Sequence, residues 1–478
     1  RYSTPSMLKT EQELVDSARQ RLRSGVAVAD PAHVDAALTQ RPELSGEQQH
    51  AVRALTTCGD GVQVLRAAAG TGKTYALEAA RAAWQESDKH VVGCALSARA
   101  ARELQEQTAI PSITIAKLLG DLSQGWAPEP FGVLVVDEAG MVGTRAMAQL
   151  ARHAEQADVK LVLVGDDRQL PEIDAGGALA GISKRIGALE LHDVRRQQHE
   201  WDREALAALR HGKINEWARA YRDHDRIHTA PTPGKVRERI VEDWWQHAKG
   251  GADAVMIAHR RTDVADLNQR ARERMHADQR LGDSELTFGE RTFAQGDRVL
   301  ARRNDHQLQV TNGTRARVTD VDLERRSLTI QPDEGEPTTL DAAYLDAGHL
   351  DHAYATTAHA LQGASVDHAH VLGSEDLYRE WGYTALTRHR HEAHFYLHSH
   401  AQTAQPLPGL EPEPDPIGER LREILGKRRH KNLAIDLTQQ RAHRSAHRGR
   451  DGAHPARTTP TVHAHDAKAL VHEVMRQR

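Results

Sequence analysis

Short apolar runs alternate with amphipathic stretches along the first 190 residues, and this alternation predicts parallel strands joined by helices. The stretches 98–107 and 144–156 have the spacing of helices that bury one face. We therefore predict an α/β domain over 44–190, preceded by a helical leader over 1–43. The runs expected to form buried parallel strands stand at 61–65, 133–136 and 160–165.

The same alternation of apolar runs and amphipathic stretches returns over 191–400, which we predict to be a second α/β domain. It is largely helical up to 250, and its apolar strand cores stand at 254–258, 370–372 and 394–397. Residues 289–345 differ, because short strand-like runs there are separated by turn signals, of which Asn312-Gly313 accepts positive φ at both central positions of a hairpin. This predicts a small β-barrel inserted in the second domain, with a decorative hairpin as the alternative.

Residues 401–478 differ in composition from both predicted domains. Five prolines alternate with acidic residues over 406–416, which is typical of an extended spacer. One helix is expected within 418–440, and the Arg, His, Gly, Pro and Thr of 441–461 cannot bury a core. We predict a proline-rich linker and a largely disordered, weakly basic tail that is dispensable.

Composition narrows the class of protein. Apolar residues make up 39% and mean hydropathy is −0.63, and no apolar run approaches the length of a membrane span, so we expect no membrane association. Two distant cysteines predict a reduced, cytoplasmic setting, and the 30 histidines are scattered without metal-ligand spacing. The net charge of −4 argues against broad electrostatic binding of DNA. Arg1 is not an initiator, so we expect the chain to begin inside a longer product.

The segment AAAGTGKT at 67–74 stands between a predicted strand and a predicted helix, the context of a phosphate-binding loop. Gly70 and Gly72 allow the backbone N–H groups around Thr71 to turn inward, at the positive end of the helix. Lys73 can then reach the β- and γ-phosphates, and the Thr74 hydroxyl can ligate Mg²⁺.

The loop departs from the usual pattern at one position, because Ala67 stands where the first glycine is expected. A dinucleotide-binding fingerprint is excluded, since its third glycine would fall at Tyr75. The structural alternative is a glycine-rich turn beside a chance lysine.

Two further strand ends supply polar groups. Asp137 and Glu138 follow the apolar run 133–136, at the edge where ligands bind in open α/β sheets. We assign Asp137 to Mg²⁺ through water and Glu138 to the attacking water, although two acids also suit a helix N-terminus. Gln169, after the run 160–165, is the candidate that senses the γ-phosphate.

Eight motifs stand in a fixed order along the chain: LSGEQ (44–48), AAAGTGKT (67–74), ALSARAA (95–101), DEAGM (137–141), GDDRQLP (165–171), VRRQ (194–197), YATTAHALQGASVD (354–367) and YTALTRHR (383–390). In these motifs and their order, the chain resembles superfamily 1 DNA helicases over about 40–400. The AYATTAHALQG and NDHQLQVTNGT stretches are similar to the RecD-type, 5′-to-3′ branch, and the chain is most similar to the helicase half of MobF/TraA-type conjugative relaxases.

The resemblance implies two RecA-like P-loop NTPase domains, an SH3-like barrel at 289–345, and ATP with Mg²⁺ as the cofactors. It further implies that Gln48 reads the adenine edge and that Arg196 and Arg388 approach the γ-phosphate as arginine fingers. Single-stranded DNA is the implied partner. The positions that match DNA contacts, each of which is also an ordinary cap or turn residue, are Ser97, Thr114, Thr357 and His359.

The leading hypothesis is thus an ATP-dependent DNA helicase and translocase that works beside a relaxase in plasmid transfer. A RecD-type repair or recombination helicase, acting with repair proteins, is the first alternative. The second is a DNA-binding recruitment module whose ATPase is inactive. Three departures from the family pattern support that second alternative, namely Ala67, Gly140 and Ala360.

Overall fold

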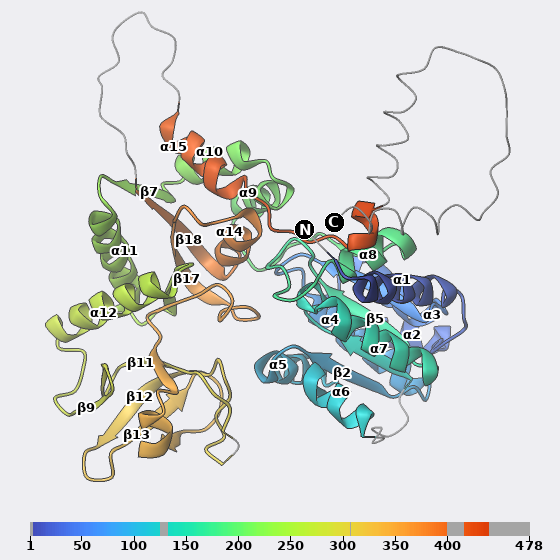
Figure 1. Cartoon of the computed structure of the whole chain (residues 1–478), viewed down its shortest axis with the longest axis horizontal. Coiled ribbons are helices and arrows are strands. Elements are labelled where there is room, and N and C mark those ends of the chain that lie inside the picture. The colour runs from blue at the N-terminus through green and yellow to red at the C-terminus, as the bar shows by residue number, and fades with distance from the viewer. Residues whose placement is uncertain (1–2, 125–131, 306, 399–414, 439–478) are drawn as a thin grey trace, which may run out of the picture. The chain divides into compact units, whose positions relative to one another are not determined.

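A computed structural model describes residues 3–124, 132–305, 307–398 and 415–438 of the chain. Among the described residues, those up to 433 form one compact unit and 434–438 belong to a second. The first unit contains two parallel sheets, a five-stranded antiparallel sheet and a two-stranded antiparallel hairpin (Figure 1). Among the described residues, we find no helix whose length and apolar character suit a membrane crossing.

The first core is built on a six-stranded sheet in the order β3-β2-β4-β5-β1-β6, in which every pairing is parallel. Its strands are β1 (Val62–Ala67), β2 (Val91–Ala95), β3 (Ser112–Thr114), β4 (Val133–Val136), β5 (Lys160–Gly165) and β6 (Leu189–Leu191). Its helices are α3 (Gly46–Thr57), α4 (Lys73–Glu86), α5 (Ala98–Thr108), α6 (Ile115–Ser123), α7 (Thr144–Gln156) and α8 (Ala178–Ile186). The apolar runs of the sequence fall on these strands, which are buried because helices cover the sheet.

The leader is part of this core rather than an appendage. It forms α1 (Pro5–Gln20) and α2 (Pro31–Thr39), each with proline in its first turn and a side-chain cap, from Thr4 and Asp30 respectively. Helix α1 packs on α7 and α8, and α2 packs on α4. Leu14, on the apolar side of α1, is only 2% exposed.

The second core is a five-stranded parallel sheet in the order β16-β8-β17-β18-β7. The strands are β7 (Ile227–Ala230), β8 (Ala254–Ile257), β16 (Ala355–Thr356), β17 (Val366–Leu372) and β18 (His389–His398). The helices are α9 (Glu200–His211), α10 (Ile214–Asp223), α11 (Pro233–Ala248), α12 (Arg261–Ala277) and α14 (Arg379–Leu386). Strand β7 lies within the stretch predicted to be largely helical. The strand is short, so the helical pattern on either side hides its signal in the sequence.

The inserted segment is an antiparallel sheet in the order β14-β13-β12-β11-β15, with a separate β9-β10 hairpin before it. The expected hairpin at Asn312-Gly313 is wrong in its details. Gly313 has φ 93°, but Asn312 is not among the described residues with positive φ, and the pair ends a long loop before β12. The elements are β9 (Glu285–Phe288), β10 (Arg291–Ala294), β11 (Arg298–Ala301), β12 (Arg315–Asp322), β13 (Ser327–Pro332), β14 (Thr338–Leu340), α13 (Ala342–Asp346) and β15 (Leu350–His352).

The region expected to be a dispensable tail contains part of the second core. Helix α15 (Pro416–Leu425) packs against α10 and α14, and Leu421, Ile424 and Leu425 are each at most 1% exposed. Beyond it, the Lys431 ammonium donates to main-chain carbonyls that include those of Ile173 (3.1 Å) and Asp174 (2.5 Å) in the first core. The predicted linker and tail at 401–414 and 439–478 lie outside the described residues.

Candidate active site

The turn between β1 and α4 has the geometry that the phosphate-loop motif predicts. Gly70 and Gly72 have φ of 83° and 70°, in the left-handed region that favours glycine. A Cβ on Gly70 would lie 2.5 Å from the Arg196 Cβ, and a Cβ on Gly72 would lie 2.6 Å from the Gln48 Nε2. Both glycines are therefore required by close neighbours as well as by the turn. Ala67, by contrast, ends β1 as a buried residue and meets no such demand.

Lys73 begins α4 and meets the two acids that follow β4. Its Nζ lies 2.6 Å from Asp137 Oδ1 and 3.0 Å from Glu138 Oε1. Burial by itself lowers the pKa of Lys73, but Asp137 and then Glu138 outweigh burial and raise it above its usual value. For the acids, burial raises the pKa of Asp137, whereas at Glu138 the Lys73 charge overcomes burial and the pKa falls.

Glu138 is held in an uncommon backbone conformation. Its φ is 51°, and a left-handed conformation at a non-glycine residue costs on the order of 1–3 kcal/mol. Asp137 Oδ1 accepts a hydrogen bond from the Glu138 N–H at 2.9 Å, and Gln362 Nε2 donates to Glu138 Oε2 at 3.4 Å. The strained turn thus aims the Glu138 carboxylate at the second core, which contributes Gln362 from the loop after β16.

Arg196 and Arg388 are brought to the same place. Arg196 Nη1 donates to the Thr387 carbonyl at 3.0 Å, while Arg388 Nε donates to the Thr384 carbonyl at 2.9 Å. Burial, followed by repulsion from Arg388, lowers the pKa of Arg196 to about 10. Burial also lowers the pKa of Arg388, and the Glu138 charge opposes this shift. Both cations are still protonated near neutral pH and stand close to one another.

One cavity of about 890 Å³ is lined by all of these groups. Gln48 and Gln169 line it too, each 6% exposed or less. Gln48 makes a capping box with Ser45 and donates to the Thr71 carbonyl at 2.9 Å, so it also supports the loop. The predicted nucleotide residues in this cavity are Gln48, Gly70, Thr71, Gly72, Lys73, Thr74, Asp137, Glu138, Gln169, Arg196 and Arg388.

Of the four predicted DNA residues, two line the nucleotide cavity and two line neither of the cavities described here, so their contacts with DNA stay a prediction. The hydroxyls of Ser97, Thr114 and Thr357 accept hydrogen bonds from the N–H groups three residues later, at 3.1, 3.2 and 3.4 Å. These are capping bonds, as expected if the three residues are ordinary cap or turn residues. His359 is exposed and lines the nucleotide cavity, as does Ser97, whereas Thr114 and Thr357 line neither of the two cavities described here.

Two residues near the cavity were missed by the sequence reasoning. Gln362 belongs to the YATTAHALQG stretch, so the motif held a signal for it. Arg210 lies on α9 outside any motif, and its guanidinium makes two bonds to the Asp166 carboxylate, at 2.9 and 3.2 Å. Side-chain exposure of this pair is 6% and 0%, so it is a buried ion pair between the α9 helix and the strand end that carries Gln169.

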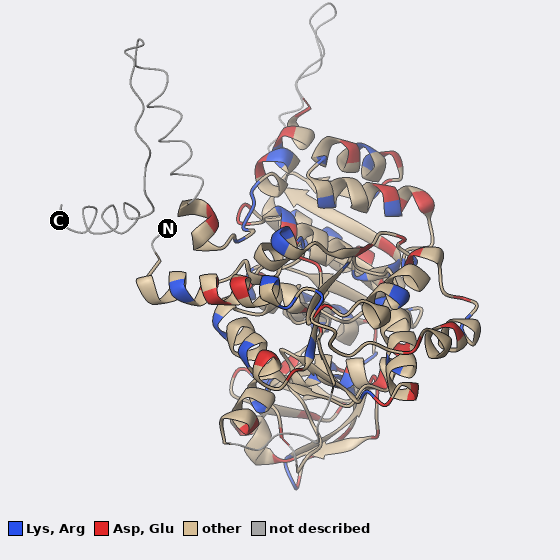
Figure 2. Ribbon diagram, turned by 90° about the vertical axis from the view of Figure 1, so that its right-hand side faces the viewer, with Lys and Arg blue, Asp and Glu red and all other residues tan. Residues whose placement is uncertain are grey.

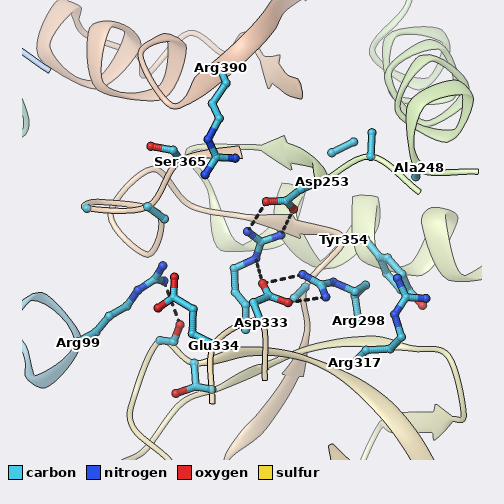
Figure 3. Close-up of a pocket in the computed structure, with 18 of the residues that line it drawn as sticks. Arg99, Ala248, Asp253, Arg298, Arg317, Asp333, Glu334, Tyr354, Ser365 and Arg390 are labelled. Atoms are coloured by element: carbon cyan, nitrogen blue, oxygen red, sulfur yellow. Dashed lines mark hydrogen bonds and ion pairs between the residues drawn. The ribbon is translucent and has the colours of Figure 1, made fainter. Parts of the chain in front are cut away.

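A second cavity of about 630 Å³ lies where α5, the second core and the inserted sheet meet (Figure 3). Its lining has eight Lys or Arg residues and five Asp or Glu residues. Basic and acidic residues are interspersed along the ribbon in Figure 2, whereas the lining of this cavity has a basic excess. Arg99 Nη1 donates to the Gly313 carbonyl at 3.1 Å and thereby joins α5 to the insertion.

Several charges in the second cavity are already paired. Arg315 binds Asp253 at 2.7 Å and Arg298 binds Asp333 at 2.7 Å, as the dashed lines in Figure 3 show. Arg99 and Arg390 reach in from different elements. The tryptophans Trp244 and Trp245 are each 2% exposed, so they pack inside the second core and offer no stacking surface.

Comparisons with known proteins agree with this geometry. A family model described as an AAA domain matches residues 43–232. The conjugal transfer protein TraA of Rhizobium radiobacter is 33% identical over 83% of this chain and 36% of its own length. The ATP-dependent RecD2 DNA helicase of Deinococcus radiodurans is 28% identical over 82% of this chain and 54% of its own. The chain thus spans about a third of the length of the TraA protein it matches.

Solved structures show the same fold. The Pif1 helicase from Bacteroides, in complex with ADP-AlF3 and ssDNA, has a TM-score of 0.50 at 17% identity, and the match covers 84% of this chain and 97% of that one. The Pif1 helicase from Candida albicans has a TM-score of 0.50 at 15% identity, covering 84% and 99%. The chain is thus related to the TraA conjugal transfer proteins and to the RecD-type helicases, and it carries an AAA domain over 43–232.

Proposed function

We propose that this chain is an ATP-dependent DNA helicase and translocase that moves along single-stranded DNA. The observation that carries the proposal is the shared cavity, in which Lys73 and the acids of the first core face Arg196 and Arg388. Groups from both halves can then touch one triphosphate, so binding of ATP and its hydrolysis change how the halves meet.

The charges suggest how the cycle runs. A triphosphate competes with Asp137 and Glu138 for Lys73, and it supplies the negative charge that Arg196 and Arg388 lack. When Lys73 moves to the phosphates, the main influence that lowers the pKa of Glu138 is removed. Glu138 becomes a stronger base at the moment when a water needs to be polarised, and Gln362 keeps its carboxylate oriented.

Mg²⁺ fits the donor set of this site. Asp137 offers carboxylate oxygen and Thr74 offers a hydroxyl, both hard ligands beside the loop, and we assign the ion to these two. When bound, Mg²⁺ neutralises charge on the phosphates. The chain's own residues position the groups: the Gly70–Thr74 backbone cradles the phosphates, and Gln169 reports on the γ-phosphate from the end of β5.

We assign the second cavity to the DNA backbone. Its local basic excess, its position beside the inserted sheet and the Arg99–Gly313 bond let one strand contact both cores and the insertion. We interpret the insertion as an SH3-like element that guides the strand, with 5′-to-3′ movement as the resemblance implies. With stacking surface scarce, the grip is mainly electrostatic and falls as salt rises.

The biological setting that we propose is plasmid transfer, in which a relaxase nicks DNA and this motor unwinds it. The TraA relatives support that setting over a repair role. A RecD-type repair helicase would use the same chemistry, and the RecD2 similarity keeps it as the second candidate.

The test is hydrolysis of ATP by the purified chain with Mg²⁺, with and without single-stranded DNA. Turnover should rise with DNA, and Glu138→Gln should lower it by a factor of hundreds or more while ATP binding persists. Glu86→Gln, an exposed change at the far end of α4, is the matched control and should leave turnover unchanged. Unchanged turnover in Glu138→Gln would overturn the assigned base.

Strand displacement from 5′- and 3′-tailed duplexes then tests polarity. For the DNA groove, exposed Arg317 is the variant and exposed Arg325 is the control, both changed to alanine. Arg317→Ala should weaken DNA binding and reduce the salt dependence by about one charge. Equal DNA affinity in the two variants would place the strand elsewhere.

A further inference from the structure

A cluster of histidines lies apart from both cavities, on the face of the second sheet that α11 covers. His247 comes from the last turn of α11, His368 from β17, and Glu392 from β18. These three residues are 145 positions apart at the extremes, so no sequence spacing announces them. Their ligand atoms all lie within 4.8 Å of one another, and each residue is partly exposed.

The hydrogen bonds fix which nitrogen of His247 carries the proton. Tyr396 donates its hydroxyl proton to Asp243 at 3.0 Å, and Asp243 is also paired with Arg239. The His370 Nδ1, 2.9 Å from the Tyr396 oxygen, must then be the donor to it, which leaves His370 Nε2 as an acceptor. His247 Nδ1 lies 3.2 Å from that nitrogen and must carry a proton. The other nitrogen of a neutral His247, Nε2, therefore holds an unshared pair.

That lone pair faces a carboxylate oxygen. His247 Nε2 lies 3.6 Å from Glu392 Oε2, with no proton to place between them. The opposite oxygen of Glu392 accepts from Arg226 at 2.6 Å, which fixes the carboxylate and leaves Oε2 turned toward the histidines. Two acceptors that face each other are mutually repulsive unless a cation lies between them.

The third group adds a further acceptor position. His368 Nδ1 lies 3.7 Å from Glu392 Oε2, beyond hydrogen-bond distance, and it is a buried atom without a hydrogen-bond partner in the described structure. His394 is close as well: its Nε2 accepts from Arg226 Nη1 at 3.0 Å and lies 3.3 Å from Glu392 Oε2. Because the Arg226 proton occupies the His394 lone pair, the candidate ligands are the imidazoles of His247 and His368 and the carboxylate of Glu392.

We propose that His247, His368 and Glu392 bind a divalent transition metal ion of the zinc class, which joins α11 to β17 and β18. Imidazole and carboxylate are ligands of such ions, and three protein ligands leave a fourth position for water. Bonds of about 2.0–2.2 Å in a tetrahedral site separate ligand atoms by roughly 3.3 Å. The two distances from Glu392 Oε2 to the histidines, 3.6 and 3.7 Å, need a small contraction, and the three ligand atoms, which lie within 4.8 Å of one another, have to draw together around the ion.

The surroundings support this site. The rings of His247 and His368 stack with centroids 3.8 Å apart and 14° between their planes. Because stacked rings direct their in-plane lone pairs along parallel lines, each ring has to turn about its Cβ–Cγ bond before both lone pairs point at one ion. The Asp243–Tyr396–His370 relay orients His247 as outer partners orient metal-ligating histidines.

The experiment uses the full chain, stripped of metal and kept free of nucleotide, titrated with Zn²⁺ against a chromophoric chelator. His368→Asn and Glu392→Gln should each weaken the one tight equivalent of Zn²⁺ by at least about tenfold. His391→Asn is the matched control, because His391 is a half-buried histidine on the same strand, beside the His368 ring, and is not one of the three ligands. Other histidines in the chain contribute a background that all the variants share.

Two further readouts separate a built site from a chance one. Substituting Co²⁺ should give tetrahedral absorption bands in the wild type and in His391→Asn, but not in His368→Asn or Glu392→Gln. Zn²⁺ should raise the unfolding midpoint of the wild type, and Tyr396→Phe should weaken binding by about tenfold through loss of the relay. The proposal would be overturned by unchanged Zn²⁺ affinity in both ligand variants. It would also be overturned if this site in the wild type binds protons but no metal ion.

Discussion

The two walls of the nucleotide cavity carry their charge in opposite ways. On the first wall, Lys73 is neutralised by Asp137 and Glu138 at hydrogen-bond distance. On the second, Arg196 and Arg388 are held by neutral oxygens, and neither has a carboxylate at ion-pair distance among the described residues. Burial and mutual repulsion lower the pKa of Arg196, which is the signature of a cation without a counter-charge.

This difference indicates which wall of the cavity depends on bound nucleotide. The Lys73 charge on the first wall is balanced by acids of the same wall, whereas the two arginines of the second wall gain a counter-charge only when an anion binds. A triphosphate therefore changes the second wall from two repelling cations to a bridged pair, while it exchanges partners on the first. Closure of the two halves follows from the second wall more than from the first.

Breaking the first wall is expected to affect hydrolysis and stability together. Lys73→Ala leaves Asp137 and Glu138 side by side without their cation and removes the contact to the phosphates, so ATP hydrolysis should fall by a factor of hundreds or more. The free energy of unfolding without nucleotide should also fall, on the order of 2 kcal/mol, because Lys73 is 23% exposed and the loss of a buried pair is discounted accordingly. Both a steady-state ATPase assay and denaturant unfolding are needed; unchanged stability would mean that the pairing is weak.

The next prediction concerns what supports the second wall. A chain ending at residue 400 loses α15 and the apolar side chains that it buries against α10 and α14, so the free energy of unfolding should fall on the order of 5 kcal/mol. A chain that ends at residue 438 keeps α15 and serves as the control. Thermal unfolding of the two truncations gives the comparison, and equal midpoints would restore the earlier view that everything after 400 is dispensable.

A smaller effect is expected at Lys160, a second buried lysine of the first core. Lys160 on β5 is fully buried and bonds only the Cys58 carbonyl, at 2.5 Å, with no carboxylate beside it at hydrogen-bond distance in the described structure. Burial lowers the pKa of Lys160 to about 8 from 10.5. Lys73 would shift in the same direction if its acids were absent.

The pH dependence follows from the number of bound protons. Between about pH 8 and 10.5 the unfolded chain keeps the proton on Lys160 that the folded chain has released, so stability rises with pH across that window. The contribution is on the order of 1–3 kcal/mol. Lys160→Met should flatten this rise, and Lys184→Met, at an exposed position on α8, should leave it intact. Denaturant unfolding at pH 7.5 and 10 measures both, and the same slope in all three proteins would refute the assigned pKa.

The sequence predicted the first wall well, and the reason is local. A strand, a glycine turn and a helix are contiguous around Lys73, and Asp137 and Glu138 directly follow a buried run, so order along the chain implies position in space. The arginines could be proposed only through resemblance to a family. Gln362 and Arg210 were missed because their partners, Glu138 and Asp166, are far away in sequence.

Ser97, Thr114 and Thr357 satisfy helix or turn N–H groups, and their contact with DNA stays a prediction, because residue type alone does not distinguish the two roles. Helices α1 and α15 look like appendages in sequence, since they flank the two domains, but their apolar faces complete those cores. The histidine cluster draws on α11, β17 and β18, and only the sheet order brings these together.

The most direct test of the shared cavity is single-turnover hydrolysis of saturating ATP by Arg388→Ala in the presence of single-stranded DNA. Arg261→Ala, at the exposed start of α12, is the control on the same half. If the second wall supplies the charge that the transition state needs, Arg388→Ala should lower the rate by about 10³ or more with ATP still bound and the fold intact. A rate within a factor of two of the wild type would show that the two halves do not share the nucleotide.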